Sequence, residues 1–150
     1  MGSTEEQDVF MSKTDSSFAV LTHDEDCHIV TQELGITPDR CHQKGEKTYS
    51  KHSPNPGIRP SGLWEISKVS IADGDSISEH IRHFQTVLGD KLQVIEKLKQ
   101  HYGYECVFHV LIETEDAGVA FDLDEAEISF INKISNRFTC SIVAIKGTLT

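Results

Sequence analysis

The sequence has no long apolar segment. No run of apolar residues approaches the roughly 18 that cross a lipid bilayer, and the first residues lack the apolar core of a secretion signal. We therefore expect a cytoplasmic protein that has no membrane among its partners.

Cysteine is also sparse in this chain. The four cysteines, Cys27, Cys41, Cys106 and Cys140, lie far apart and form no CxxC pair. Small domains that depend on disulfides carry cysteine more densely and are exported. We therefore expect no disulfide framework and a reducing compartment.

Basic residues are fewer than acidic residues in this chain. The 150 residues include 14 Lys and Arg against 24 Asp and Glu, which gives a formal net charge of -10. A protein that binds duplex nucleic acid needs a basic face to release counterions, so the charge disfavours that class. It favours a basic protein as the partner.

Motifs of the common catalytic classes are missing as well. The sequence contains no GxSxG, no HExxH and no GxxxxGK phosphate cradle. We therefore predict no catalytic residue and no cofactor, and we favour a non-enzymatic protein over an enzyme.

Two Cys–His dipeptides, Cys27-His28 and Cys41-His42, could supply four zinc ligands. Structural zinc sites usually present ligands two to four residues apart on tight turns, whereas adjacent side chains point in divergent directions. We therefore predict no metal site, and in each dipeptide a half-buried thiol beside a surface histidine.

The clearest periodicity runs over residues 76–103. Large apolar residues recur there every three or four positions, which places them on one face of a helix. Gly89 divides the segment into two helices, with expected caps at Ser76 and Asp90. His80 and His83 fall at the edge of the apolar face, so we expect a solvated position for both. His109 alternates with apolar residues on a strand and should be a satisfied core or edge histidine.

The rest of the chain reads as short strands and helices. Expected strands lie at 17–22, 63–69, 105–114, 119–123 and 138–145, and expected helices at 27–34 and 124–134. From residue 63 the order is β-α-β-β-α-β. We predict an α+β fold with a mostly antiparallel sheet of about five strands and helices on one face. Its core would be a ferredoxin-like split β-α-β unit, preceded by a strand and a helix. Residues 1–16 would form a mobile tail and 17–150 a single domain.

All four prolines lie within residues 37–62, where no periodicity is sustained. We expect a long loop, of the kind that is often functional or disordered. The loop is locally basic because five basic residues, Arg40, Lys44, Lys47, Lys51 and Arg59, exceed the acidic Asp39 and Glu46.

Carboxylates gather after the long strand at 105–114. An acidic interaction face, a cation site and plain solvation are all open interpretations of this cluster. The candidate interaction surface combines these acids with the basic loop and the single tryptophan, and comprises Glu113, Glu115, Asp116, Asp122, Glu125, Lys44, Arg59 and Trp64.

One family resemblance accompanies these patterns. The segment LGITPDR with Ile36, Thr37 and Pro38, then Lys44-Gly45, and then a lone Trp64 that opens a strand resemble the mainly bacterial family known as domain of unknown function 4279, over about residues 17–145. The resemblance implies a small cytoplasmic α+β domain and brings no agreed activity. By analogy, some small acidic bacterial proteins of this kind are immunity proteins encoded beside secreted toxins.

The leading functional hypothesis is therefore a non-enzymatic interaction module, of an immunity type, that neutralises a basic toxin or effector. The alternative is a small enzyme or ligand-binding domain that uses loop 37–62 as a lid. That alternative predicts a pocket that gathers Lys44, Arg59 or Trp64 with His80 or His83. A homodimer formed through an open sheet edge is a third hypothesis.

Overall fold

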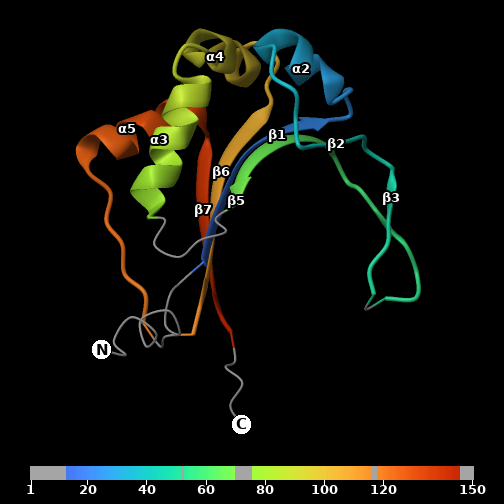
Figure 1. Cartoon of the computed structure of the whole chain (residues 1–150). Helices are drawn as coiled ribbons and strands as arrows, with labels where there is room; N and C mark the ends of the chain where they lie inside the picture. Colours follow the sequence, from blue (N-terminus) through green and yellow to red (C-terminus); the bar gives the residue numbers. More distant parts are fainter. Residues whose placement is uncertain (1–12, 52, 70–75, 116–117, 146–150) are drawn as a thin grey trace.

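The sheet is built around its first strand, β1 (Lys13–His23). In the computed structural model, β1 pairs antiparallel with β5 (Gly62–Val69) on one side and with β6 (Glu105–Thr114) on the other. The short strand β2 (Arg40–His42) extends the sheet beyond β5, and β7 (Arg137–Ala144) lies parallel to β6. The order β2-β5-β1-β6-β7 confirms a mostly antiparallel sheet of five strands (Figure 1).

The four helices of the described residues lie on one face of this sheet. They are α2 (His28–Leu34), α3 (Ile77–Leu88), α4 (Leu92–Gln100) and α5 (Glu125–Ile134). Figure 1 shows that β1 and β5 bend, with the helices on the convex side and none of the described helices on the concave side. The structure describes residues 13–51, 53–69, 76–115 and 118–145, and none of the helices in these ranges is long and apolar enough to span a bilayer.

The core fills the space between the sheet and the helices. Alternate residues of β1 and β6 point towards the helices, and Phe18, Val20 and Phe108 are fully buried there. The Phe108 ring lies edge-on to Phe84 of α3, with ring centroids 5.4 Å apart, and stacks on Phe138 of β7 at 6.0 Å. Such aromatic pairs stabilise a core beyond the area they bury.

The two helices expected in residues 76–103 are present. The Ser76 side chain accepts a hydrogen bond from the Glu79 backbone N–H, which confirms the first cap, and the chain leaves helical geometry after Gly89. The second expected cap is wrong, because α4 starts after Lys91 and no side chain caps it. At α5, Asp124 and Glu127 form a reciprocal capping box.

One expected strand does not form. Residues 119–123 are irregular, so the β-α-β-β-α-β order is not realised and the ferredoxin-like arrangement is not confirmed. The physical reason is that both edges of β6 are already paired, one with β1 and the other with β7. Val119 and Leu123 instead pack against the core as an irregular segment.

The N-terminal boundary also differs from the expectation. Lys13 to Ser16 belong to β1 rather than to a tail, and residues 1–12 of the expected tail lie outside the described residues. Thr14 and Ser16 occupy buried positions on the helix side, and their polar side chains conceal the strand from a search for apolar alternation.

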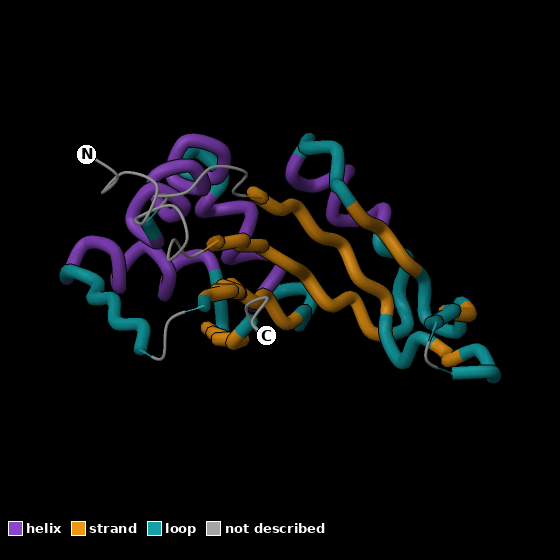
Figure 2. Tube along the Cα trace, turned by 60° about the horizontal axis from the view of Figure 1, so that its bottom comes forward, coloured by secondary structure: helices purple, strands orange, loops and turns teal. Residues whose placement is uncertain are grey.

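The segment 37–62 is more regular than a loop. Besides β2 it contains β3 (Lys47–Thr48) and β4 (Gly57–Ile58), which pair antiparallel as a separate two-stranded sheet. We call residues 43–61 the arm. Figures 1 and 2 show that the arm extends away from the helices beyond the end of the main sheet.

Candidate functional site

The concave side of the sheet is its open face, which we define as the residues of the five main strands that point away from the helices. The pairing registers align these residues in rows across the strands. One row consists of Ser67, Ser17, His109 and Thr139, from β5, β1, β6 and β7. Polar side chains therefore cross the middle of a surface that no described helix covers.

A cleft of about 310 Å³ lies on the open face. Its walls include Asp15, Ser17, Arg40, Glu65 and His109. The Arg40 Nε atom donates a hydrogen bond of 2.7 Å to Glu65 Oε1, and the Glu65 side chain is only 15% exposed. His109 bonds through Nδ1 to Thr139 Oγ1. Volumes of 300 to 1,000 Å³ are usual for ligand pockets, so the cleft is at the small end of that range.

None of the residues named for the lid hypothesis lines this cleft. Lys44 instead forms an ion pair with Asp24 at the surface, and this hydrogen bond holds the pKa of Asp24 below its usual value. Arg59 lies in the arm, where its backbone N–H bonds to the Glu46 carbonyl. Three further pockets on the described residues also have walls without Lys44, Arg59, Trp64 or either helical histidine.

Trp64 lies in the core, not at the surface. It is 0% exposed, lies edge-on to Phe18 and donates its indole N–H to Thr31 Oγ1 at 2.9 Å. Its inclusion in the candidate interaction surface is therefore wrong. Trp64 occupies a helix-facing position of β5, which the alternation of that strand could have indicated.

His80 is likewise buried, which corrects the expectation of a solvated position. It is 0% exposed, and its Nδ1 atom forms a short hydrogen bond with Ser16 Oγ. His80 lies three residues after Ile77 and four before Phe84, so it falls within the buried stripe of α3 rather than at its edge. His83 is exposed as expected, and partial burial with the nearby Lys68 lowers its pKa.

The acidic residues of the candidate surface that the structure describes are exposed, except for Glu113. Glu115, Asp122 and Glu125 are exposed and form no ion pair with another described residue, while Glu113 is half-buried and lies opposite Lys13 on β1. Asp116 lies outside the described residues. In Figure 1 the segment carrying these acids runs from the far end of β6 to the start of α5.

The arm is the basic counterpart of that segment. Lys47 and Lys51 are exposed on it, and two large side chains project beside them: Tyr49 is 80% exposed and Ile58 is 69% exposed. The exposed lysines of the arm and the acids between β6 and α5 thus lie on different segments of the chain.

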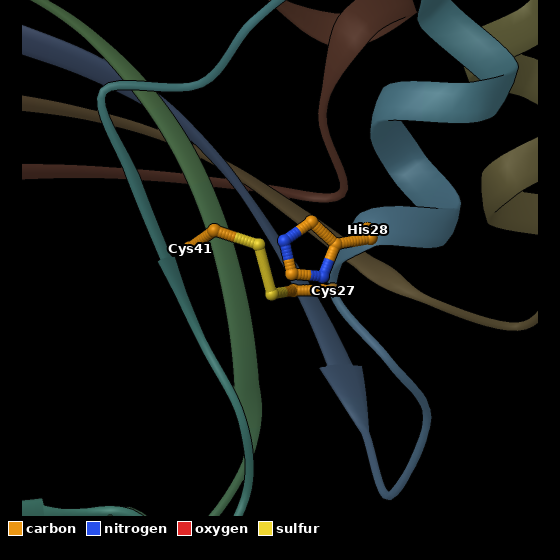
Figure 3. A group of neighbouring side chains, drawn as sticks. All are labelled: Cys27, His28 and Cys41. Carbon is orange, nitrogen blue, oxygen red and sulfur yellow. A yellow bond between two sulfur atoms is a disulfide. The ribbon is translucent and has the colours of Figure 1, made fainter.

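Cys27 and Cys41 form a disulfide with Cα atoms 5.9 Å apart, contrary to the expectation of reduced thiols. Cys27 occupies the position just before α2 and Cys41 lies on β2, so the bond joins a helix to the edge strand of the sheet (Figure 3). The 14-residue separation hides the pairing in the sequence, since only the fold brings the two residues together. Cys106 and Cys140 are free thiols.

His28 completes a cluster with the two sulfurs. One donor atom from each of Cys27, His28 and Cys41 lies within 4.8 Å of the others. The assumption of divergent side chains is thus wrong for Cys27-His28, because the chain turns into α2 between them. It is right for Cys41-His42, because neighbouring strand residues point to opposite faces: Cys41 pairs with Trp64, and His42 with Leu63 on the open face.

Asp26 and Gln43 support the imidazole of His28. Asp26 Oδ1 lies 2.8 Å from His28 Nδ1 and accepts a 2.6 Å hydrogen bond from Gln43 Nε2. The bond from Gln43, followed by those from His28, lowers the pKa of Asp26 to about 2. The carboxylate is therefore ionised throughout the neutral range.

Together these features define an α+β domain with one helix-covered face and one open, concave face. The chain belongs to the family described as a domain of unknown function (DUF4279), whose model matches residues 12–143. No curated protein and no solved structure is significantly similar to it. The functional argument therefore rests on the geometry of this chain.

Proposed function

We propose that the protein is a non-enzymatic interaction module that binds a basic protein partner. The observation that carries this proposal is the set of exposed carboxylates of Glu115, Asp122 and Glu125, which no described basic group neutralises, in a chain of net charge -10. Complementary charge accelerates encounter and excludes partners of like charge. The same net charge disfavours duplex nucleic acid and anionic membranes as partners.

The most specific form of the proposal is an immunity protein that neutralises a basic toxin or effector in the bacterial cytoplasm. In that compartment, cellular thiol reductants would keep Cys27 and Cys41 in the dithiol form. Cells are quenched in acid, the protein is alkylated in denaturant so that buried thiols also react, and the count of alkylated cysteines tests the compartment. Four alkylated cysteines are expected, whereas two would place the protein in an oxidising environment.

The partner test uses the product of the adjacent gene as its probe. Tagged full-length protein should capture that product at physiological salt and bind it more tightly at low salt, because screening weakens surface charge pairs. Failure to capture it at either salt concentration would count against the immunity form.

A matched pair of variants then locates the binding surface. The triple variant Glu115→Lys/Asp122→Lys/Glu125→Lys changes the net charge by +6, and so does the control Glu79→Lys/Asp90→Lys/Glu96→Lys on α3, α4 and the turn between them. Electrostatic steering raises association rates by about 10- to 1,000-fold. We expect the first variant to associate at least about tenfold more slowly than the control. Equal rates would show that only the total charge matters and would refute the proposed surface.

The cleft on the open face supports a second candidate, a domain that binds a small polar ligand. Arg40 and Glu65 offer a cation and an anion side by side at its wall, and His109 adds a third polar group. A thermal-shift screen with small carboxylates and phosphates tests this function. Stabilisation should be lost in Arg40→Gln and kept in Arg82→Gln, which removes an exposed arginine of α3.

A further inference from the structure

We propose that the cluster of Cys27, His28 and Cys41 is a zinc site when its disulfide is reduced. Each residue supplies one donor, and these three atoms already lie within 4.8 Å of one another. Two thiolates and one imidazole are a ligand set that zinc prefers, whereas calcium and magnesium prefer oxygen. Three protein ligands leave the fourth tetrahedral position to water or to an external ligand.

The surroundings of His28 prepare it for this role. Its Nδ1 atom is 2.8 Å from Asp26 Oδ1, so Nδ1 carries the proton that it donates to the carboxylate. The other ring nitrogen, Nε2, is left with its lone pair, and Figure 3 shows that it lies on the side of the sulfurs. A carboxylate that orients a histidine in this way is the usual outer partner of a zinc-bound imidazole.

Gln43 holds the two halves of the cluster together without the disulfide. Its Nε2 atom donates to Asp26 at 2.6 Å, and its Oε1 atom accepts from the Cys27 backbone N–H at 3.3 Å. Both contacts run from the residues after β2 to the start of α2. The donors would therefore stay close after the sulfur–sulfur bond is broken.

Conversion of the disulfide into the zinc site takes two steps, thiol–disulfide exchange and then metal binding. A dithiol reductant supplies two electrons and two protons, the Cys27–Cys41 bond breaks, and the reductant becomes a disulfide. Zinc then displaces the two thiol protons, forms two Zn–S bonds and accepts the lone pair of His28 Nε2. A tetrahedral ion with Zn–S bonds of about 2.3 Å needs its sulfurs about 3.8 Å apart. Side-chain rotation supplies that opening, since the Cα atoms are 5.9 Å apart.

Access to the site is from the His28 side. Cys27 is 0% exposed, while the side chains of His28 and Asp26 are 65% and 58% exposed. An ion can therefore reach the cluster without unfolding of the core. Either the disulfide or a bound zinc ion would cross-link α2 and β2. This inference does not depend on the proposed protein partner.

The test is zinc binding by the full-length protein in a phosphine reductant, measured by competition with a colorimetric chelator. The reduced protein should bind one equivalent, and the oxidised protein should bind with at least about a hundredfold lower affinity. Cobalt in place of zinc should give the charge-transfer absorption of thiolate ligation. Binding of equal affinity by oxidised protein would overturn the site, and so would the absence of one-to-one binding after reduction.

Surface variants keep the test independent of folding. His28→Ala removes an exposed ligand and should weaken zinc binding at least about tenfold, and Asp26→Asn should weaken it about 10- to 100-fold through the orientation of the ring. His101→Ala, an exposed histidine at the end of α4, and Cys140→Ser, a free thiol, should bind as the unaltered protein does. If His28→Ala binds normally, or if Cys140→Ser abolishes binding, the assignment is wrong.

Discussion

Loss of the Cys27–Cys41 disulfide should lower the stability of the domain by a predictable amount. The bond joins residues 14 positions apart and so closes a loop of 15 residues. The variant Cys27→Ser/Cys41→Ser removes this constraint from the unfolded chain while leaving two small polar side chains in its place.

The magnitude follows from the length of the loop. The chain-entropy model assigns about 3 kcal/mol at 25 °C to a cross-link that closes 15 residues. For a domain of this size, each kcal/mol corresponds to a change of about 2 to 4 °C in melting temperature. The oxidised protein should therefore melt about 6 to 12 °C above the variant.

The assay is urea unfolding of the oxidised protein, the reduced protein and the variant, all in the presence of a strong chelator so that no zinc replaces the disulfide. The reduced protein and the variant should agree with each other and fall below the oxidised protein. A thiol count after unfolding in urea provides the control, with two reactive thiols expected before reduction and four after it.

Two results would contradict the reasoning. If the oxidised protein shows four reactive thiols, the two cysteines do not pair. In the second case, the oxidised protein shows two reactive thiols and yet unfolds at the same urea concentration as the variant. Residues 27 and 41 would then already be close together in the unfolded variant, and the chain-entropy account of the disulfide would fail.

Other predictions concern the core, a helix cap and a thiol. Phe108→Ala should cost about 3 to 5 kcal/mol in urea unfolding because its ring is fully buried, and Phe138→Ala, at 37% exposure, should cost clearly less; equal losses would contradict the packing described here. Asp124→Ala should lower the unfolding free energy by about 1 kcal/mol through loss of the capping box, and Asp124→Asn should restore most of it. Burial raises the pKa of Cys106 from 9.0 to about 12, so its neutral thiol favours the fold below pH 9 and stability falls as the pH rises from 9 towards 12. At pH 8 Cys106 should resist alkylation in the native protein far longer than Cys140, and equal rates measured by mass spectrometry would refute its burial.

The sequence predicts the parts of this fold in which local signals agree. The pair α3 and α4 combines an amphipathic period with Ser76 as a cap and Gly89 as a break, and both helices are present. The strands β5, β6 and β7 are predicted by their alternation and β-branched residues. These elements fix the fold class as α+β.

The wrong predictions fall where contacts between distant parts of the chain determine the structure. The apolar segment 119–123 has the composition of a strand, but β6 offers it no free edge. The sequence places His80 at the edge of the apolar face of α3, but it is buried, and Ser16 of β1 supplies the hydrogen-bond partner that permits its burial. Neither the pairing of both edges of β6 nor the presence of Ser16 beside His80 can be read from a local pattern.

The sequence predicts the candidate sites least well, because residues that are distant in the sequence form them. The row that contains Ser17, His109 and Thr139 exists only through the register of three strands that lie far apart in the sequence. Cys27 and Cys41 likewise meet only because β2 pairs with β5. Register would have to be known before either arrangement could be proposed.

The central position of β1 has a consequence for the time course of synthesis. The ribosome makes β1 before any other described strand, yet its two partners end at Val69 and Thr114. At about 5 to 20 residues per second, roughly 5 to 20 s pass between the start of β1 and the end of β6. During that interval the eleven residues of β1, the central strand of the future sheet, have at least one unpaired edge. The first of the described strands to be made is thus among the last to be fully paired, and a pause in translation before β6 would lengthen its exposure to aggregation.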